Sequence, residues 1–276
     1  IYYYDEPLHN YDYGTPDALD LRETAVKYAE GFGIPWRKVL SPDQIHSLID
    51  LKDEQNHIVK QLTTEDGKKT WLRIFDDMTK YPEEQEVSTA LYRLEHGAVN
   101  AGFLIGQNER SIRRTEDADY SGFSSSLNTR NALVNTGFDV KEIVADTTLN
   151  TDILVIADAK KEFTEEENAN IFKYLDKGGN MVLTFEPQRA DIVSRILEYL
   201  GVGVLSGTMV YPVSQTSPTV IPAETTDYAS TLSPYFFYGM KVSMPTAAAI
   251  DYRLSSEWDA VPILASPGKD CWNETE

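Results

Sequence analysis

Residues 151–187 read TDILVIADAKKEFTEEENANIFKYLDKGGNMVLTFEP, and this stretch decides the fold. Ile153–Ala157 is a continuous apolar run closed by Asp158, which is typical of a strand covered on both faces, as in a parallel sheet. Thr164 and Glu167 then form a capping box. In such a box the hydroxyl accepts a backbone N–H in the first turn of a helix, and the carboxylate accepts the N–H of the capping residue. The sequence therefore predicts a helix that begins after Thr164.

The predicted helix has a single apolar stripe and a clear end. The stripe consists of Ile171, Tyr174 and Leu175, with Phe172 beside it. The pair Gly178–Gly179 ends the helix, and Met181–Phe185 forms a second buried run. Strand, helix and strand in this order predict one right-handed βαβ crossover. This layout hosts many functions, so the chemistry has to be argued from particular side chains.

The same alternation extends to both sides of this unit. Strands are predicted at Val99–Ile105 and Val140–Ala145, and helices at Ser124–Thr136 and Ala190–Leu200. Strands and helices that alternate in this way predict an α/β fold with a doubly wound, mostly parallel sheet over residues 97–276. From Gly201 onward the pattern weakens into an irregular extension, whose role at 208–276 the sequence does not indicate. There Val202–Leu205, Phe236–Met244 and Ala247–Tyr252 are predicted as short strands, and Thr208–Thr226 as loop or edge structure.

Residues 1–96 are predicted to form a smaller α/β domain. Ser41 and Pro42 open a helix as cap and first residue, and Gly67 marks the turn of a hairpin. The hairpin strands are His57–Leu62 and Thr70–Phe75, and further helices are predicted at Asp17–Glu30 and Glu83–Leu94. Ile1–Tyr4 suits either a first strand or a frayed end.

Composition excludes several classes of partner. The chain of 276 residues has a net charge of −19, and nucleic acid or anionic lipid would require basic surface instead. Cys271 is the only cysteine, so no internal disulfide is possible. No apolar run approaches 18 residues, the length that would span a membrane. Because the sequence begins at Ile1 without Met and stops at Glu276 in an acidic segment, we expect a piece of a larger protein.

No catalytic, metal or cofactor motif is assembled in the sequence. Gly201, Gly203 and Gly207 have the wrong spacing for a dinucleotide loop and follow a helix, whereas that loop opens one. A nucleophile elbow is absent, and Ser124–Ser126 is better explained as a helix cap. The histidines show no metal-binding spacing; they are His9, His46, His57 and His96. We therefore expect no cofactor, no metal and no catalytic residue.

The polar residues worth weighing follow the predicted strands. Asp158, at the end of its strand, occupies the position where open α/β sheets place their ligands. Gly106, Glu109 and Arg110 follow the Val99–Ile105 strand, and Glu186 follows the Met181–Phe185 strand. If these strands are neighbours, the residues form one rim that suits a ligand or partner site, or else ordinary turns and caps. Asp76 and Asp77 are adjacent and would point to opposite faces of a strand, so they cannot easily share one ion.

Three segments together resemble a known family. They are AGFLIGQNERS at 101–111, DILVIADAKKEFTEEENANIFKYLDKGGNMVLTFEP at 152–187 and LGVGVLSGTMV at 200–210. The chain resembles the gliding-motility-type (GldG-like) auxiliary proteins of ABC transporters, which are related to an intraflagellar-transport domain. The resemblance covers roughly Ala98–Val210 and, more weakly, the flanks. The family's strand-end loop often reads G-H-G-E-R, and here it keeps Gly106, Glu109 and Arg110 but has no His.

The resemblance implies an extracytoplasmic (periplasmic) domain of a bacterial inner-membrane protein, with the membrane segments outside this sequence. It implies ABC permease and ATPase subunits as partners, a flavodoxin-like or glutamine-amidotransferase-like fold, and a thioredoxin-like domain at 1–96 that lacks C-x-x-C. Our leading hypothesis is a non-catalytic binding or assembly domain, with Glu109, Arg110 and Asp158 as rim contacts. The alternatives are a hydrolase-like enzyme on the amidotransferase-like fold, and a periplasmic sugar- or peptide-binding module. The module would use the aromatic residues Tyr235, Phe236, Phe237 and Tyr238.

Overall fold

A computed structural model describes most of the chain in two compact units. The described residues are 21–51, 54, 58–75, 82–213, 217–233, 235–237, 239–252 and 257–275. The first unit comprises residues up to Val99 together with 113–115 and 120–139, and the second comprises 100–112, 116–119 and 140 onward. The predicted strand Ile1–Tyr4, the start of the helix predicted from Asp17, and the pair Asp76–Asp77 lie outside the described residues. The domain division at residues 96 and 97 stays a prediction.

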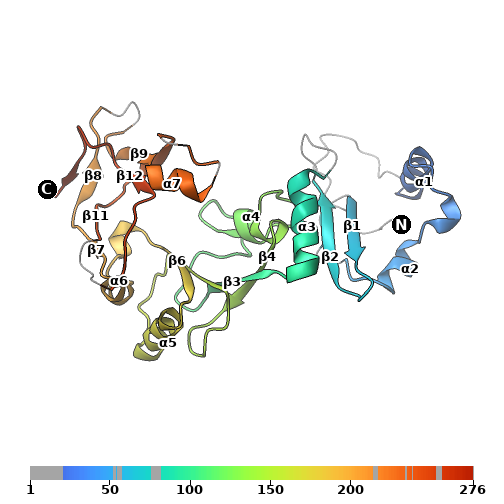
Figure 1. Cartoon of the computed structure of the whole chain (residues 1–276), viewed down its shortest axis with the longest axis horizontal. Helices are drawn as coiled ribbons and strands as arrows, with labels where there is room; N and C mark the ends of the chain where they lie inside the picture. Colours follow the sequence, from blue (N-terminus) through green and yellow to red (C-terminus); the bar gives the residue numbers. More distant parts are fainter. Residues whose placement is uncertain are drawn as a thin grey trace. The chain divides into compact units, whose positions relative to one another are not determined.

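Four strands form a parallel sheet in the order β4-β3-β5-β6 (Figure 1). They are β3 (Val99–Leu104), β4 (Phe138–Ile143), β5 (Ile153–Ala157) and β6 (Asn180–Thr184). Strand β5 runs parallel to both neighbours, with Val155 opposite Phe103 on one side and Val182 on the other. The chain passes from β3 to β4 on one side and then returns to β5 on the other, so the strand order reverses between β3 and β5. Open α/β sheets form their ligand crevice at such a reversal, at the carboxyl ends of the strands.

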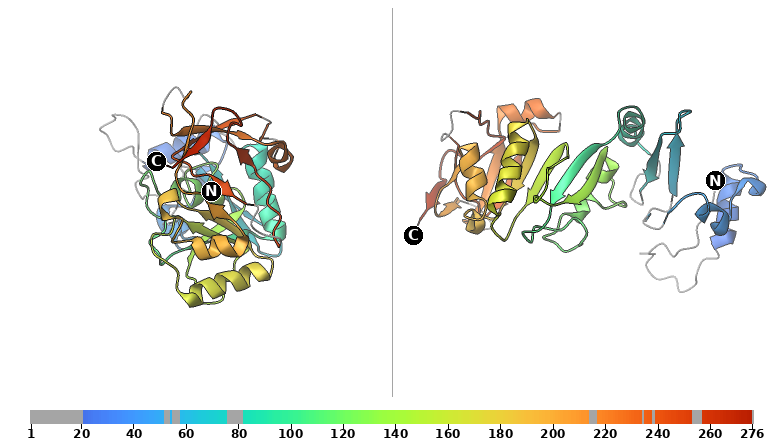
Figure 2. Two further views of the ribbon diagram at one scale, coloured as in Figure 1. Left: turned by 90° about the vertical axis from the view of Figure 1, so that its left-hand side faces the viewer. Right: turned by 90° about the horizontal axis from the view of Figure 1, so that it is seen from below.

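The predicted strand–helix–strand unit at 151–187 is confirmed. Helix α5 (Glu165–Asp176) begins after Thr164, whose Oγ1 accepts the N–H of Glu167 at 3.2 Å. The Glu167 carboxylate in turn accepts the N–H of Thr164 at 2.7 Å. Helix α6 (Ser194–Leu200) lies beside α5 (Figure 2), and both share one apolar core with β5. The most deeply buried side chains of that core are Leu154, Ile156, Ile171 and Ile196.

We expect Thr164→Ala to lower the free energy of unfolding by about 1 kcal/mol, because it removes the capping hydroxyl and leaves the Glu167 N–H without its acceptor. Urea unfolding followed by circular dichroism measures the change. Thr148→Ala is the matched control, since Thr148 is exposed in the loop after β4 and caps no helix. An equal loss in both variants would show that the capping box does not stabilise α5.

The predicted helix Ser124–Thr136 is wrong. Helix α4 covers only Ser121–Ser124, so Ser124 ends a helix instead of capping the start of one, and Leu133–Asn135 form a single 3-10 turn, η2. The Asn135 side-chain amide donates to the carbonyls of Ser126, Leu127 and Thr129 at 3.1, 3.2 and 2.9 Å. Asn, Ser and Thr side chains compete with the helix for backbone partners, and this segment is rich in them.

The double winding is incomplete, although the α/β class is correct. Residues 144–152, all of them described, contain no helix between β4 and β5. The helix predicted from Ala190 begins only at Ser194, after the 3-10 turn η3 (Pro187–Arg189). The strand predicted from Val140 begins at Phe138. A parallel sheet therefore forms without a full helix in every crossover.

The weakly patterned region after Gly201 is more ordered than predicted. Strand β9 (Val220–Thr225) is the centre of a three-stranded antiparallel sheet, although Pro222 suits an edge better. Its burial alternates, with Ile221, Ala223 and Thr225 inward. Its partners in that sheet are β10 (Lys241–Pro245) and β12 (Leu264–Ala265), and helix α7 (Asp227–Leu232) follows it in the chain. Two further two-stranded sheets are formed by β7 (Gly203–Val204) with β11 (Ile250–Asp251) and by β8 (Thr208–Val210) with β13 (Trp272–Glu274).

The first unit contains the predicted hairpin and a helix packed on it. Strands β1 (Ile58–Thr63) and β2 (Lys69–Ile74) pair antiparallel around Gly67, and α3 (Glu84–His96) lies against β2 (Figure 1). The unit also contains helices α1 (Leu21–Gly31) and α2 (Pro42–His46), the 3-10 turn η1 (Trp36–Lys38), and α4 and η2 from residues 120–139. Across the described residues of both units, we find no helix with both the length and the apolar character needed to cross a membrane. The thioredoxin-like assignment of residues 1–96 stays a prediction.

Candidate functional site

Three strand-end segments of the second unit meet at one edge of the parallel sheet. Strands β5 and β6 end level with each other, with Ala157 opposite Thr184. Asp158 follows β5 directly, and Glu186 comes two residues after β6. The loop after β3 returns to β5, where the N–H of Arg110 donates to the Ala157 carbonyl at 2.8 Å. The strands are neighbours, which is the condition that the predicted rim required.

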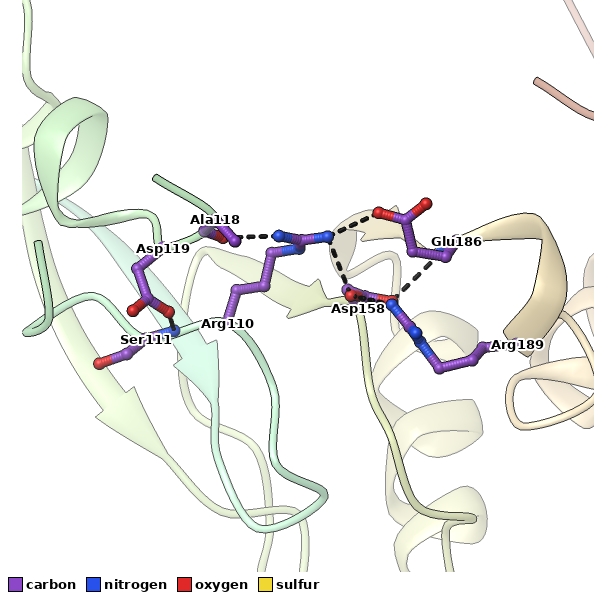
Figure 3. Close-up of polar contacts among 7 residues, drawn as sticks. All are labelled: Arg110, Ser111, Ala118, Asp119, Asp158, Glu186 and Arg189. Carbon is purple, nitrogen blue, oxygen red and sulfur yellow. Dashed lines mark hydrogen bonds and ion pairs between the residues drawn. The ribbon is translucent and has the colours of Figure 1, made fainter. Parts of the chain in front are cut away.

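The Asp158 carboxylate lies at the centre of this edge and is almost fully buried, at 2% exposure (Figure 3). Arg189 donates to both of its oxygens, from Nε to Oδ1 at 3.0 Å and from Nη2 to Oδ2 at 2.5 Å. The backbone N–H of Glu186 donates to Oδ1 at 3.2 Å, and Arg110 Nη2 lies 3.1 Å from Oδ2. All four acceptor positions of the carboxylate therefore face a donor.

Arg110 joins Asp158 to two further segments. Its Nη2 donates to Oε1 of Glu186 at 2.6 Å, and its Nη1 donates to the carbonyl of Ala118 at 2.7 Å. The Asp119 carboxylate beside Ala118 accepts the N–H of Ser111 at 2.8 Å (Figure 3). We call Arg110, Asp158, Glu186 and Arg189 the strand-end quartet; two carboxylates and two guanidinium groups make it neutral.

Asp158 adopts a backbone conformation that only a few residue types tolerate. Its φ is +53°, in the left-handed region, where Asp and Asn are accepted more readily than other residues with a Cβ. Its N–H donates to the Thr184 carbonyl at 2.8 Å, which continues the ladder between β5 and β6 by one residue. The turn directs the carboxylate back over the strand ends, where the arginines reach it.

The Asp158 carboxyl is ionised. Burial by itself would raise its pKa, but the hydrogen bonds from Arg189 and from the Glu186 N–H, with the positive charges of Arg189 and Arg110, outweigh burial and lower the pKa below its ordinary value. A carboxylate that is ionised and saturated with protein donors cannot accept a substrate proton without losing one of them. Its role is to hold three loops together.

Glu109 does not join the quartet, although it is only one residue from Arg110. Its side chain is buried, at 7% exposure, and Oε2 accepts the N–H of Gln107 at 2.9 Å. Oε1 of Glu109 and Oε1 of Gln107 are both enclosed and have no hydrogen-bond partner among the described residues. The loop reaches this arrangement through positive φ at Gly106, +131°, and Asn108, +58°.

Burial raises the pKa of Glu109 above its ordinary value, against the lowering effect of the N–H groups of Glu109, Gln107 and Gly106. The negative charge of Glu167 raises it slightly further. Gln107 connects these carboxyl groups, because its Nε2 donates to Oε1 of Glu167 at 2.9 Å. The loop after β3 is thereby tied to the capping box of α5.

This pKa predicts that Glu109→Gln stabilises the protein as pH rises. Because the folded-state pKa is raised, the stability from this group is fully present below its unfolded pKa, about 4.3, and is lost as pH rises through the folded pKa. Glutamine carries no charge, so the free energy of unfolding of the variant should rise relative to that of the wild type as pH increases. Urea unfolding from pH 4 to 8 tests this, with Glu162→Gln on the exposed surface as control. Parallel pH curves for wild type and Glu109→Gln would contradict it.

Of the predicted rim residues, the structure brings together Arg110, Asp158 and Glu186. Gly106 shapes the loop and Glu109 faces the interior instead. Sequence reasoning missed Arg189, which is the principal partner of Asp158. The available signal was its place in the Glu186–Arg189 turn directly after β6, because a buried strand-end carboxylate requires a cation nearby.

The structure also shows where the other residues considered as functional candidates lie. Tyr235, Phe236 and Phe237 are exposed in the loop after α7, and Tyr238 lies outside the described residues. Burial raises the pKa of the half-buried Cys271 thiol, which disfavours the reactive thiolate. Within the described ranges, no group of three or more His, Cys, Asp or Glu side chains is arranged to hold a metal ion.

Comparison with known proteins finds a likeness among solved structures. No protein-family model matches the chain, and no curated protein matches it. A solved structure described as the mmIFT52 N-terminal domain is similar, with 16% sequence identity and a TM-score of 0.46, over 63% of this chain and 76% of that chain. At that identity and score, nothing about function transfers from it.

Proposed function

We propose that this chain is a non-catalytic binding or assembly domain, exposed outside the cytoplasm and attached to an ABC-type export system. The observation that carries the proposal is the saturated carboxylate of Asp158, with a donor at every acceptor position. Such a group has no lone pair left for a substrate proton or a metal ion. It fixes three loops in one arrangement, and a binding edge is most effective when it is rigid before the partner arrives.

The outer members of the quartet supply the contact surface. The side chains of Glu186 and Arg189 are 39% and 31% exposed, whereas that of Asp158 is 2% exposed. Charges of both signs at a partly solvated rim set the orientation and rate of association more than the affinity. The edge therefore suits a polar protein surface of mixed charge.

The resemblance to GldG-like proteins supplies the identity of the partner. We infer permease and ATPase subunits of an ABC transporter, a periplasmic location, and membrane attachment through segments outside this sequence. The net charge of −19 supports a protein partner over nucleic acid. We also assign residues 97–276 a flavodoxin-like or glutamine-amidotransferase-like sheet, supported by the reversal of strand order between β3 and β5, and residues 1–96 a thioredoxin-like fold.

Site-specific photo-crosslinking in the full-length protein and its native membranes tests this proposal. The crosslinking residue replaces Gln188, which is exposed between Glu186 and Arg189. Lys173, exposed on α5, is the matched control position. We expect permease or ATPase subunits to be crosslinked from position 188 and not from 173. Recovery of no transporter subunit from position 188, or equal recovery from both positions, would overturn the proposal.

Glu109 supports a second candidate, a hydrolase-like enzyme on the amidotransferase-like fold. A buried carboxyl group with a raised pKa keeps its proton closer to neutral pH, as general acids do. Its Oε1 is enclosed, so the loop after β3 would have to open for a substrate to reach it. Steady hydrolysis of a defined amide or ester that disappears in Glu109→Gln would favour the enzyme and contradict the non-catalytic proposal.

A further inference from the structure

A cavity of about 160 Å³ lies within the first unit, lined by strand β2, helix α3 and residues 134–137. Three of its lining side chains are cationic: Lys69, Arg73 and Arg93. Three others are apolar and buried: Leu72, Phe75 and Ala90. A cavity of similar volume, about 150 Å³, is large enough to hold benzene. The space therefore fits a small molecule with one apolar part and one anionic part.

The carboxylate in the lining does not neutralise these cations, because its oxygens are already engaged. Oε1 of Glu86 accepts from Arg130 Nη1 at 2.7 Å, and its Oε2 accepts the backbone N–H of Glu83 at 2.6 Å. Arg130 also lies over the Phe75 ring, 5.0 Å from its centroid, which fixes the guanidinium group beside Glu86. Glu86 is thus part of the wall. Arg73 pairs instead with Glu54, and Arg93 with Asp139, and neither of these carboxylates belongs to the lining.

The two arginines keep unused donors. A guanidinium group has five N–H donors. Arg73 donates from Nε to Glu54 at 3.0 Å and from Nη1 to Asn135 at 3.1 Å. Arg93 donates from Nη1 to the Phe138 carbonyl at 3.1 Å and from Nη2 to Asp139. These contacts orient each guanidinium group while leaving part of its N–H set for another acceptor.

Lys69 adds a further positive charge at the same cavity. It forms no ion pair within the part of the chain that the structure describes, and it is exposed at the start of β2. Since Arg73 and Arg93 already pair with Glu54 and Asp139, Lys69 supplies the uncompensated charge among the described lining residues. Fork-shaped guanidinium donors match the two oxygens of a carboxylate, and charge-assisted hydrogen bonds of this kind are the strong ones.

We propose that this cavity binds a small organic carboxylate. Its carboxylate group accepts hydrogen bonds from Arg93 and Arg73 and is approached by Lys69, and its apolar body lies against Leu72, Phe75 and Ala90. Inorganic phosphate and sulfate lack such a body, and the volume excludes a nucleotide. This site is separate from the strand-end quartet and does not depend on the proposed assembly function.

Calorimetric titration of the 276-residue chain with benzoate and with its neutral counterpart benzamide tests the proposal. Both probes have nearly the same shape and differ in charge. We expect saturable binding of benzoate that is about tenfold tighter than that of benzamide, since hydrogen bonds to a charged group contribute about 1.5–3 kcal/mol. Absence of saturable benzoate binding, or equal affinity for the two probes, overturns the proposal.

Three variants locate the binding in this cavity. Arg93→Gln should weaken benzoate binding about tenfold and still fold, because its partner Asp139 is exposed. Lys69→Gln should weaken it about threefold, whereas Lys60→Gln, on the neighbouring strand and outside the cavity, should have no effect. Thr89→Met places a longer side chain into the cavity and should abolish benzoate binding. Methionine has a good helix propensity, so helix α3 should still form in this variant. Unchanged benzoate affinity in Thr89→Met, with unchanged thermal unfolding, places the binding elsewhere and overturns the proposal.

Discussion

Replacing Asp158 by alanine is expected to lower the free energy of unfolding of the second unit by about 3–5 kcal/mol. The carboxylate is 2% exposed and is the shared partner of Arg110 and Arg189. Its removal leaves the guanidinium groups of Arg110 and Arg189 without this shared acceptor at the strand ends. In addition, alanine tolerates the left-handed φ of +53° at this position less well than aspartate does. The loss is larger than that of an exposed ion pair because the charge left behind is partly buried.

Asp158→Asn separates these two effects. Asparagine accepts the left-handed conformation and keeps one acceptor oxygen, so we expect it to be less destabilising than alanine while still losing the charge. Asp146→Asn, in the exposed turn after β4, is the control and should change stability by no more than about 0.5 kcal/mol. Because the chain has two compact units, hydrogen exchange of β5 amides is the preferred measurement, since it reports on the second unit directly.

The effect of Asp158→Asn should depend on pH in the opposite direction to that of Glu109→Gln. The pKa of Asp158 is lowered, so its contribution is present above its unfolded pKa, about 3.9, and is lost as pH falls through the folded pKa. The wild type and Asp158→Asn should therefore converge in stability in acid. A difference that stays constant from pH 7 to pH 3 would show that charge pairing is not what the substitution removes.

Gly179→Ala is expected to lower the free energy of unfolding by about 2–4 kcal/mol. A Cβ at this position would lie 2.3 Å from Cε1 and 2.5 Å from Cδ1 of Tyr174, too close for either to remain in place. The Tyr174 ring is buried in the core, and its hydroxyl donates to the Asn180 carbonyl at 2.9 Å. Moving the ring would therefore both disturb the core packing and weaken the hydrogen bond to the Asn180 carbonyl.

Gly178→Ala is the matched control, one residue away. Gly178 has a φ of +84° and nothing within 4 Å of the added Cβ, so alanine there should cost only about 1 kcal/mol of backbone strain. In a Tyr174→Leu background, the additional loss from Gly179→Ala should shrink, because the ring atoms that it meets are gone. Equal destabilisation by the two alanine substitutions in urea unfolding would rule out the ring contact as the cause.

The parts of the fold that the sequence predicted well are those stabilised by contacts close in the chain. The capping box at Thr164, the apolar stripe of α5 and the two apolar runs beside it all lie within 37 residues, and each is visible as a local pattern. The segment 124–136 shows the limit of such reasoning. Its apolar spacing suited a helix, but the Asn135 amide bonds three carbonyls of the preceding turns and stabilises them instead. Side-chain competition of this kind depends on geometry that spacing does not show.

The candidate site divides in the same way. The sequence alone determined that Asp158 ends a buried strand and that Arg110 and Glu186 follow two others, because apolar runs and their polar ends are local features. Only the tertiary structure decided that Arg189 is the main partner of Asp158, that Glu109 turns inward, and that three cations line one cavity in the first unit. These outcomes depend on which strands are adjacent and on positive φ at single residues such as Asp158 and Asn108. Strand adjacency brings together residues that are far apart in the chain, so no pattern of neighbouring residues records it.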